Sequence, residues 1–375
     1  MQAKDYFAQH EKDILEDIKR LVLADSPSQN KELLDQCKNV IQNMFHENFK
    51  RRAQEFVMTH NGNHLRFEVG EGKEQVLIMG HYDTVWDEGM LPYRIEPDKI
   101  YGPGILDMKS GLISALWLLK YIQKFNKPLK RRIVFLINSD EEIGSPTSRK
   151  LIEEEAAKSV AAFVLEPAVV GSGALKTGRK GTSKYLLTFH GIASHAGNNP
   201  LDGASAIVEA AEQILAVEQL NDYDKGTTLN VGLMEGGGKL NVIPNRAHLG
   251  IEVRSKTSTE QNRIHDYFVQ LQPKNPRIQM TMEGGINRPP MEQDEDNLEL
   301  FEVAKGVAAE LGFSIGDALV GGASDGNFAS QFAPTLDGLG LVGEGLHAMH
   351  EHIERKYIVD RFALLTNTVL KVVNQ

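Results

Sequence analysis

The sequence predicts an α/β fold with a mostly parallel central sheet and a smaller, inserted α+β domain. Short apolar runs, typical of strands buried on both faces, alternate with helical patterns through most of the chain. A different order, strand–helix–strand–strand–helix–strand, occupies residues 184–284. At roughly 100–200 residues per domain, the 375 residues also suit two domains.

Three apolar runs are predicted to be strands of the large domain. They are Val76–Gly80, Ile133–Asn138 and Ala162–Glu166. Between the first two, the apolar residues of 111–125 recur at helical spacing, as do those around 14–22 near the N-terminus. Helices over 298–311 and 360–373 follow the inserted domain. The alternation of strands and helices indicates a doubly wound architecture.

The inserted domain is expected to span residues 179–288, which leaves 1–178 and 289–375 for the large domain. Its predicted strands cover 185–190, 227–234, 247–254 and 277–282, and its helices cover 204–220 and 258–271. This order matches a ferredoxin-like unit, with two helices on one side of a four-stranded antiparallel sheet. Glycine- and proline-rich stretches at 171–181 and 284–290 bracket the unit, and we interpret both as hinges.

Composition excludes several classes of function. The 41 Lys and Arg against 51 Asp and Glu leave a net charge of −10, whereas a nucleic-acid partner needs a basic face. The single cysteine, Cys37, excludes an intrachain disulfide and thiolate-rich metal sites. No apolar run reaches the roughly 18 residues of a membrane span, and the N-terminus has no signal-peptide pattern. We therefore expect a cytoplasmic protein.

Each of the three predicted strands ends in side chains that can bind metal. His81, Tyr82 and Asp83 follow the first strand, residues 140–142 follow the second and Glu166 ends the third. The carboxyl ends of parallel strands meet at one edge of a sheet, where α/β proteins bind ligands. Acidic endings gathered there would repel one another without a cation, so they predict a metal site.

Two aspartates near these strand ends have both a functional and a structural interpretation. Asp83 points to the same side as His81, where it could accept the second imidazole N–H and select the metal-binding tautomer. The alternative is a loop histidine beside a capping aspartate. Asp107, in the glycine-rich segment 102–111, could bridge two cations, or it could cap the helix that follows.

Glu141 and Glu142 are the pair most suggestive of acid–base chemistry. If they point apart, one can bind a metal while the other reaches a metal-bound water. The alternative is the acidic first turn of a helix. A glycine-rich segment near the C-terminus carries His347, His350 and His352, and one ligand among the three is expected.

His195 lies in the predicted inserted domain, far in sequence from the other candidates. It could be a turn histidine next to the start of a helix. Alternatively, it could reach the catalytic cleft, from its own domain or from a partner subunit, and polarise a substrate carbonyl.

Seven short segments with these residues occur in order along almost the whole chain. They are MGHYDTV (79–85), GPGILDMKSG (102–111), SDEEIGS (139–145), LEP (165–167), SHAG (194–197), NVIP (241–244) and GEGLH (343–347). Together they resemble the dinuclear zinc exopeptidase and deacylase family. The resemblance implies a zinc-exopeptidase-like catalytic domain with an inserted lid or dimerisation domain.

The resemblance also implies a ligand set. Asp107 would bridge two zinc ions, for which cobalt or manganese could substitute. His81 and Glu166 would complete one site, and Glu142 with His347 would complete the other.

Further roles follow from the same resemblance. Glu141 would be the general base that deprotonates a water between the metals, and Asp83 would orient His81. His195 would stabilise the oxyanion, in this family often across a dimer interface, and Asn241 would help to bind substrate. A homodimer through the inserted domain is implied as well.

Within the family, the carboxypeptidase G-like branch is the most similar. Its members have an arginine before a proline in the segment that returns to the catalytic domain, and Arg288 matches it. A guanidinium there would bind the substrate's terminal carboxylate, although a structural role is the alternative. Glu351, four residues after His347, fits the glutamate that often follows the ligand in this family.

The expected function is hydrolysis of an amide bond in a small peptide or an N-acyl amino acid, with release of a C-terminal amino acid such as glutamate. One rival is an aminopeptidase or tripeptidase of the same family, and another is a non-catalytic binding protein that keeps the fold. A third is a magnesium-dependent phosphate enzyme, but no phosphate-binding loop accompanies the acidic strand ends, and histidine ligands favour zinc.

Overall fold

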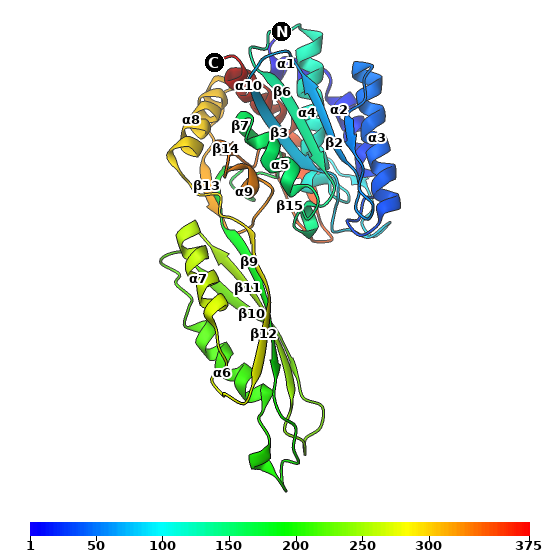
Figure 1. The fold of residues 1–375 in the computed structure, drawn as a ribbon. Helices are drawn as coiled ribbons and strands as arrows, with labels where there is room; N and C mark the ends of the chain where they lie inside the picture. Colours follow the sequence, from blue (N-terminus) through cyan, green and yellow to red (C-terminus); the bar gives the residue numbers. More distant parts are fainter. The chain divides into compact units, whose positions relative to one another are not determined.

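The computed structural model describes residues 1–375, which form two compact units (Figure 1). Unit 1 comprises Met1–Gly178, Gln293–Val320 and Ser324–Gln375. Unit 2 comprises Arg179–Glu292 and Gly321–Ala323.

Unit 1 contains a six-stranded sheet with the order β1-β2-β6-β3-β7-β14. Its strands are β1 (Gln54–Phe56), β2 (His64–Val69), β3 (Gln75–His81), β6 (Arg132–Asn138), β7 (Ser159–Val164) and β14 (Thr335–Leu336). Strands β6, β3, β7 and β14 pair in parallel, and β2 and β1 extend the sheet antiparallel. The prediction of a mostly parallel central sheet is confirmed, although the sequence patterns did not reveal β2.

Helices surround this sheet. They are α1 (Ala3–Gln9), α2 (Glu11–Val22), α3 (Lys31–Phe49), α4 (Ser110–Lys124), α5 (Arg149–Ala156), α8 (Glu295–Glu310), α9 (Gly326–Ala329) and α10 (Ile358–Val373). The predicted helices at 111–125, 298–311 and 360–373 correspond to α4, α8 and α10 with small shifts of their ends.

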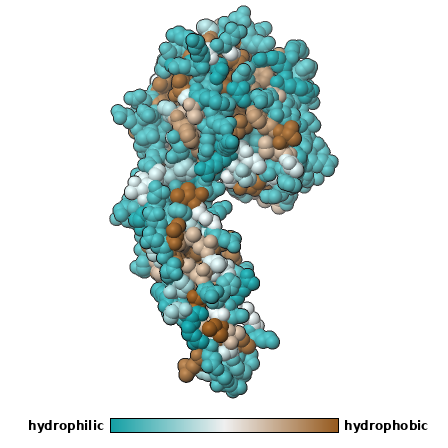
Figure 2. Space-filling view, in the orientation of Figure 1, coloured by the Kyte–Doolittle hydropathy of each residue, from teal (hydrophilic) through white to brown (hydrophobic).

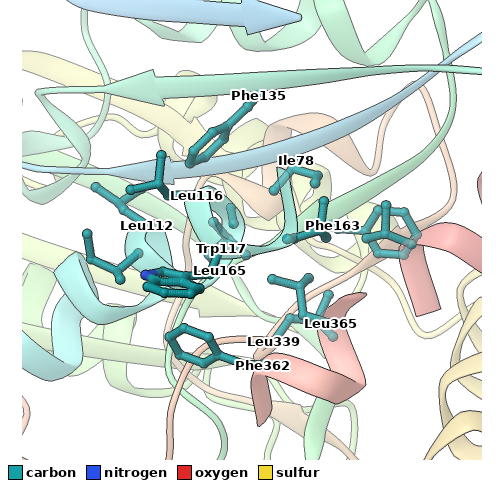
Figure 3. Close-up of a cluster of buried hydrophobic side chains, with 14 of the residues drawn as sticks. Ile78, Leu112, Leu116, Trp117, Phe135, Phe163, Leu165, Leu339, Phe362 and Leu365 are labelled. Atoms are coloured by element: carbon teal, nitrogen blue, oxygen red, sulfur yellow. The ribbon is translucent and has the colours of Figure 1, made fainter. Parts of the chain in front are cut away.

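The central strands are buried on both faces, which explains their continuous apolar runs. On one face, Ile78 and Phe135 belong to a core that includes Trp117 of α4 and Phe362 of α10 (Figure 3). On the other face, alternate residues of the same strands pack with side chains of α5 and α9; the strand residues are Leu77, Met79, Val134 and Leu136. The carboxyl ends of β3, β6 and β7 therefore lie at a single edge of a sheet that is covered on both faces.

Two smaller sheets complete unit 1. One pairs β8 (Leu175–Arg179) with β13 (Asp317–Val320). The other has the order β15-β16-β5-β4, with β15 (Gly343–Glu344), β16 (His352–Glu354), β5 (Lys99–Tyr101) and β4 (Arg94–Ile95). This second sheet joins the C-terminal histidine segment to the strand that precedes Asp107.

Unit 2 has the ferredoxin-like architecture that the strand and helix order predicts. Its sheet has the order β10-β11-β9-β12 and is antiparallel throughout. The strands are β9 (Gly181–His190), β10 (Thr228–Gly236), β11 (Arg246–Ser255) and β12 (Gln279–Arg288), and the helices are α6 (Ala206–Glu218) and α7 (Ser258–Gln270). Helix α7 begins after Thr257, whose side chain accepts the N–H of Glu260.

The two stretches interpreted as hinges are largely strand. The first contains β8, in which every residue is buried, and the second contains the end of β12. Gly284 adopts a φ of +97°, and a Cβ there would lie 2.1 Å from the backbone oxygen of Lys184 in the paired strand β9. Glycine at 284 therefore permits close pairing of two strands within unit 2, and the hinge role of both stretches stays a prediction.

The surface in view is mainly hydrophilic, with hydrophobic residues scattered over it (Figure 2). None of the helices combines the length and the apolar character needed to cross a membrane.

Candidate metal centre

The carboxyl ends of three central strands bring metal-capable side chains together in unit 1. His81 is the last residue of β3, the turn Glu141–Ile143 follows β6, and Glu166 follows β7. Ligand-capable atoms of His81, Glu141 and Glu166 lie within 4.8 Å of one another. The same limit holds for His81, Asp107 and Glu142. The strand endings therefore converge as the sequence predicts.

Asp107 lies between two groups of ligand atoms. Its Oδ1 is 3.2 Å from His81 Nε2, which is also 3.5 Å from Glu166 Oε1. Its Oδ2 is 3.3 Å from His347 Nε2, which is also 3.3 Å from Glu142 Oε2. We refer to His81, Glu166 and Asp107 Oδ1 as the first ligand group, and to His347, Glu142 and Asp107 Oδ2 as the second ligand group.

These distances fit the edges of tetrahedral zinc sites. Zinc binds nitrogen and oxygen at about 2.0–2.1 Å, so two ligand atoms of one tetrahedron lie about 3.3 Å apart. An octahedral magnesium site would bring them to about 2.9 Å, and magnesium prefers oxygen ligands. The four observed distances, 3.2–3.5 Å, agree with the tetrahedral value.

Unsatisfied polar atoms in the cluster also indicate a cation. His81 Nε2, Asp107 Oδ1 and Glu142 Oε1 are buried and make no hydrogen bond. The first two lie 3.2 Å apart, yet their geometry is not that of a hydrogen bond. Buried polar atoms normally have partners, and atoms that converge without bonding one another suit a shared cation. The residues present therefore fit a metal pair.

In the absence of a cation, three side chains of the two ligand groups, His81, His347 and Glu142, bind protons more tightly than usual. Burial lowers the pKa of His81, but the Asp107 and Asp83 carboxylates outweigh it and keep that pKa well above its usual range. The Asp107 and Glu142 carboxylates raise the pKa of His347 to about 10. Burial and the charge of Asp107 raise the pKa of Glu142 to about 7. Divalent cations would replace these protons.

Asp83 supports the first ligand group and the adjacent turn. His81 Nδ1 lies 3.0 Å from the backbone oxygen of Asp83 and 3.4 Å from its Oδ1, so the nearer acceptor is the carbonyl and not the expected carboxylate. The carboxylate instead accepts the backbone N–H groups of Glu141 and Glu142, each at 3.2 Å. Ser28 Oγ donates to the same carboxylate at 2.8 Å. Asp83 therefore fixes the turn that carries both glutamates.

Asp107 lies in residues 104–109, which we call the Asp107 loop and which contain a distorted helical turn, Ile105–Lys109. It does not cap α4, which begins at Ser110. Three backbone N–H groups of this loop donate to Glu351, which is 1% exposed. Glu351 Oε1 accepts from Leu106 at 2.9 Å and Asp107 at 3.1 Å, and its Oε2 accepts from Gly104 at 3.1 Å and Trp86 Nε1 at 2.5 Å.

The C-terminal histidines differ in position. His347 has a φ of +56°, which is rare for a residue with a side chain and is typical of functional sites. Its Nε2 belongs to the second ligand group. His352 lies in β16, where its Nδ1 is 2.7 Å from the backbone oxygen of His350, and neither belongs to a ligand group.

Two predicted site residues, His195 and Asn241, are neighbours within unit 2. The backbone N–H of Ala196 donates to the backbone oxygen of Asn241 at 3.0 Å. His195 Nδ1 accepts the backbone N–H groups of Gly197 at 3.2 Å and Asn198 at 3.1 Å. A neutral His195 therefore carries its proton on Nε2, which is then a donor.

Arg288 ends β12, also in unit 2, opposite Thr182 of β9. It is 4% exposed, and its backbone oxygen accepts from Gln261 Nε2 at 2.9 Å. The substrate contact expected of Arg288 stays a prediction.

Ser28, Trp86 and the acceptor role of Glu351 could not be predicted from the sequence. Ser28 and Trp86 lie outside the ligand-bearing positions, although Trp86 directly follows a motif. Only the four-residue spacing from His347 to Glu351 offered a signal.

Comparison with known proteins agrees with this geometry. Residues 77–371 match peptidase family M20/M25/M40. Carboxypeptidase G2 of Pseudomonas sp. (strain RS-16) is 32% identical over 286 residues, which cover 74% of this chain and 69% of the relative. Succinyl-diaminopimelate desuccinylase of Cupriavidus taiwanensis is 26% identical over 316 residues, which cover 77% of this chain and 80% of the relative.

A solved structure shows the same fold. The aminopeptidase PepT of Bacillus cereus ATCC 10987 superposes with a TM-score of 0.81 at 22% identity, covering 96% of this chain and 98% of the other. The family match spans most of the chain, and the carboxypeptidase relative is similar over more than two thirds of its own length. The chain therefore belongs to peptidase family M20/M25/M40 and is a peptidase or amidohydrolase of that family.

Proposed function

We propose that this chain is a dinuclear zinc hydrolase that cleaves an amide bond in a small peptide or an N-acyl amino acid and releases a C-terminal amino acid such as glutamate. The observation that carries the proposal is Asp107, whose two oxygens face two different histidine–carboxylate pairs. A carboxylate shared by two three-ligand groups is an arrangement that can hold two metal ions.

The ligand roles follow from the two groups. His81 and Glu166 would hold one zinc ion, His347 and Glu142 the other, and Asp107 both. Cobalt or manganese could occupy the same nitrogen and oxygen ligands. When bound, the two cations would lower the pKa of a shared water and polarise the amide carbonyl.

Glu141 is the proposed general base. It lies within 4.8 Å of His81 and Glu166, measured between ligand-capable atoms, and the bonds to Asp83 fix the backbone of its turn. Glu141 takes a proton from the attacking water and returns it to the leaving amine. The adjacent Glu142 belongs to the second ligand group, so the two carboxylates have separate tasks.

Unit 2 would supply the substrate-binding residues. Because the backbone holds His195 with its proton on Nε2, that nitrogen can donate to the amide oxygen as negative charge develops there. Asn241, on the paired segment, would help to bind the substrate. Arg288 would bind the terminal carboxylate through a bidentate guanidinium. We also propose a cytoplasmic homodimer formed through unit 2, with His195 acting in its own chain or across the dimer.

A release assay tests the proposed specificity. Purified zinc-loaded protein is incubated with N-acyl-glutamates, with the matching C-terminal carboxamides, and with free tripeptides. We expect hydrolysis of the free-acid N-acyl substrates, little hydrolysis of the carboxamides, and loss of activity with EDTA that zinc restores. Selective hydrolysis of tripeptides from their free amino end would instead support an aminopeptidase, and failure to hydrolyse any substrate would support a binding protein.

The variant Arg288→Lys sharpens this assay. Lysine keeps the positive charge but cannot form a bidentate pair with a carboxylate. We expect a higher KM for the free-acid substrates with little change for the carboxamides. Equal effects on both substrate classes would assign Arg288 a structural role.

A further inference from the structure

We propose that Glu351 is a positioning residue that holds the Asp107 loop in place and thereby sets the affinity of the second ligand group for its cation. This inference rests on the proposed metal pair and adds a residue outside the ligand set. Glu351 does not touch either ligand group with its side chain but binds the backbone that presents their shared carboxylate.

The Asp107 loop depends on Glu351 for three of its hydrogen bonds. Gly104 has a φ of +66°, and Asp107 has φ −116° and ψ 91°, so the backbone at Asp107 departs from the helical turn Ile105–Lys109 that contains it. Its N–H groups at 104, 106 and 107 all donate to the Glu351 carboxylate. Buried N–H groups without an acceptor are costly, so this carboxylate stabilises the loop conformation.

Only a carboxylate can satisfy this set of donors. Four N–H groups, three from the loop and one from Trp86, converge on the two oxygens of Glu351. Glutamine has nearly the same shape but offers one oxygen, and its NH2 group would face two of the four donors. The substitution Glu351→Gln therefore removes acceptors without opening a cavity.

Glu351 also ties the loop to the segment that carries His347. Its own backbone N–H donates to the Ala348 oxygen at 2.8 Å, within the turn that follows His347. The second ligand group takes ligands from both segments that Glu351 joins, Asp107 and His347. The first group takes only Asp107 from them, because His81 and Glu166 come from strand ends. Loss of Glu351 should therefore lower the cation affinity of the second ligand group more than that of the first ligand group.

The test measures zinc binding directly. Metal-free wild-type protein and Glu351→Gln are titrated with Zn²⁺ in competition with a chromophoric chelator, and urea unfolding is measured in parallel. We expect two Zn²⁺ per wild-type chain. In Glu351→Gln one of the two Kd values should rise by about 10–100-fold while the other changes little, as for partners that orient metal ligands.

Glu209→Gln is the matched control. Glu209 in unit 2 is 2% exposed and accepts the N–H groups of Lys274 and Asn275 and of the Gln213 side chain. The same substitution there removes similar bonds far from any ligand in the sequence. It should lower stability and leave both Zn²⁺ affinities unchanged.

Several outcomes would overturn the inference. If Glu351→Gln binds two Zn²⁺ with wild-type affinities, or only loses stability as Glu209→Gln does, Glu351 has no positioning role although the proposed function stands. If the wild type itself binds no Zn²⁺, the proposed function fails and the inference fails with it.

A milder variant covers the case in which Glu351→Gln does not fold. Trp86→Phe keeps an aromatic ring but removes the indole N–H that donates to Glu351 Oε2. We expect a rise of about threefold in the Kd that Glu351→Gln affects, the effect of one lost hydrogen bond. Unchanged affinities in that variant would overturn the inference.

Discussion

Replacing Asp83 by asparagine tests whether one buried carboxylate holds the Glu141–Glu142 turn beside the first ligand group. Asp83 is fully buried and accepts three hydrogen bonds through its two oxygens. Two of these come from the backbone of the two glutamates, and the third comes from Ser28.

The size of the effect follows from these contacts. If the asparagine oxygen takes the place of Oδ2, it keeps the bonds from Ser28 and Glu142, and the NH2 group faces the N–H of Glu141. An unsatisfied buried donor costs about 1–3 kcal/mol, so we expect a loss of that size in the free energy of unfolding. The Glu141–Glu142 turn would also move away from the substituted side chain. Because this turn carries a predicted ligand, zinc affinity should fall by about 10–100-fold.

The assay combines urea unfolding with zinc titration, and it uses Asp337→Asn as its control. Asp337 is also fully buried in unit 1 and accepts a hydrogen bond from Ser324 Oγ at 2.6 Å, but it belongs to no ligand group. We expect both variants to lose stability and only Asp83→Asn to lose zinc affinity. Wild-type zinc affinity in Asp83→Asn would refute the reasoning. An equal loss of zinc affinity in both variants would also refute it.

Further predictions concern the base, the protons and the packing of the site. Glu141→Gln should keep its zinc content, measured by mass spectrometry, and lose about 10²–10⁴-fold in kcat; near wild-type turnover would exclude Glu141 as the base. The pKa values of His81 and His347 are raised in the metal-free protein, so zinc must displace their protons to bind. Zinc affinity should therefore rise as pH rises from 6 to 9, by about tenfold per pH unit for each proton released. Calorimetry that finds no proton release would contradict this prediction. A Cβ on Gly111 would lie 2.3 Å from the backbone oxygen of Leu165, so Gly111→Ala should shift α4 and lower the thermal midpoint, and an unchanged midpoint would contradict this close packing.

Much of the architecture could be predicted because it depends on local patterns. The runs at β3, β6 and β7 are apolar on both faces, so they indicated buried parallel strands, and the polar residues after them indicated one edge. The order of elements in unit 2 likewise led to a ferredoxin-like sheet. The short strand β8 was missed because its residues, LKTGR, carry no apolar run even though all are buried.

The support of the site could not be predicted, because it depends on contacts between distant segments. Glu351 accepts the N–H of Leu106 across 245 positions of the chain, and Ser28 donates to Asp83 across 55. No periodicity or spacing encodes such pairs. The nearer acceptor for His81 Nδ1, the Asp83 carbonyl, is a backbone atom, and a side-chain pattern cannot reveal it.

The most direct test of the metal pair is a crystal structure of zinc-loaded protein with anomalous diffraction at the zinc edge. We predict two anomalous peaks about 3.5–4 Å apart, one on each side of the Asp107 carboxylate. One peak should lie beside His81 and Glu166, and the other beside His347 and Glu142. A single peak, or two peaks that do not share Asp107, would contradict the account.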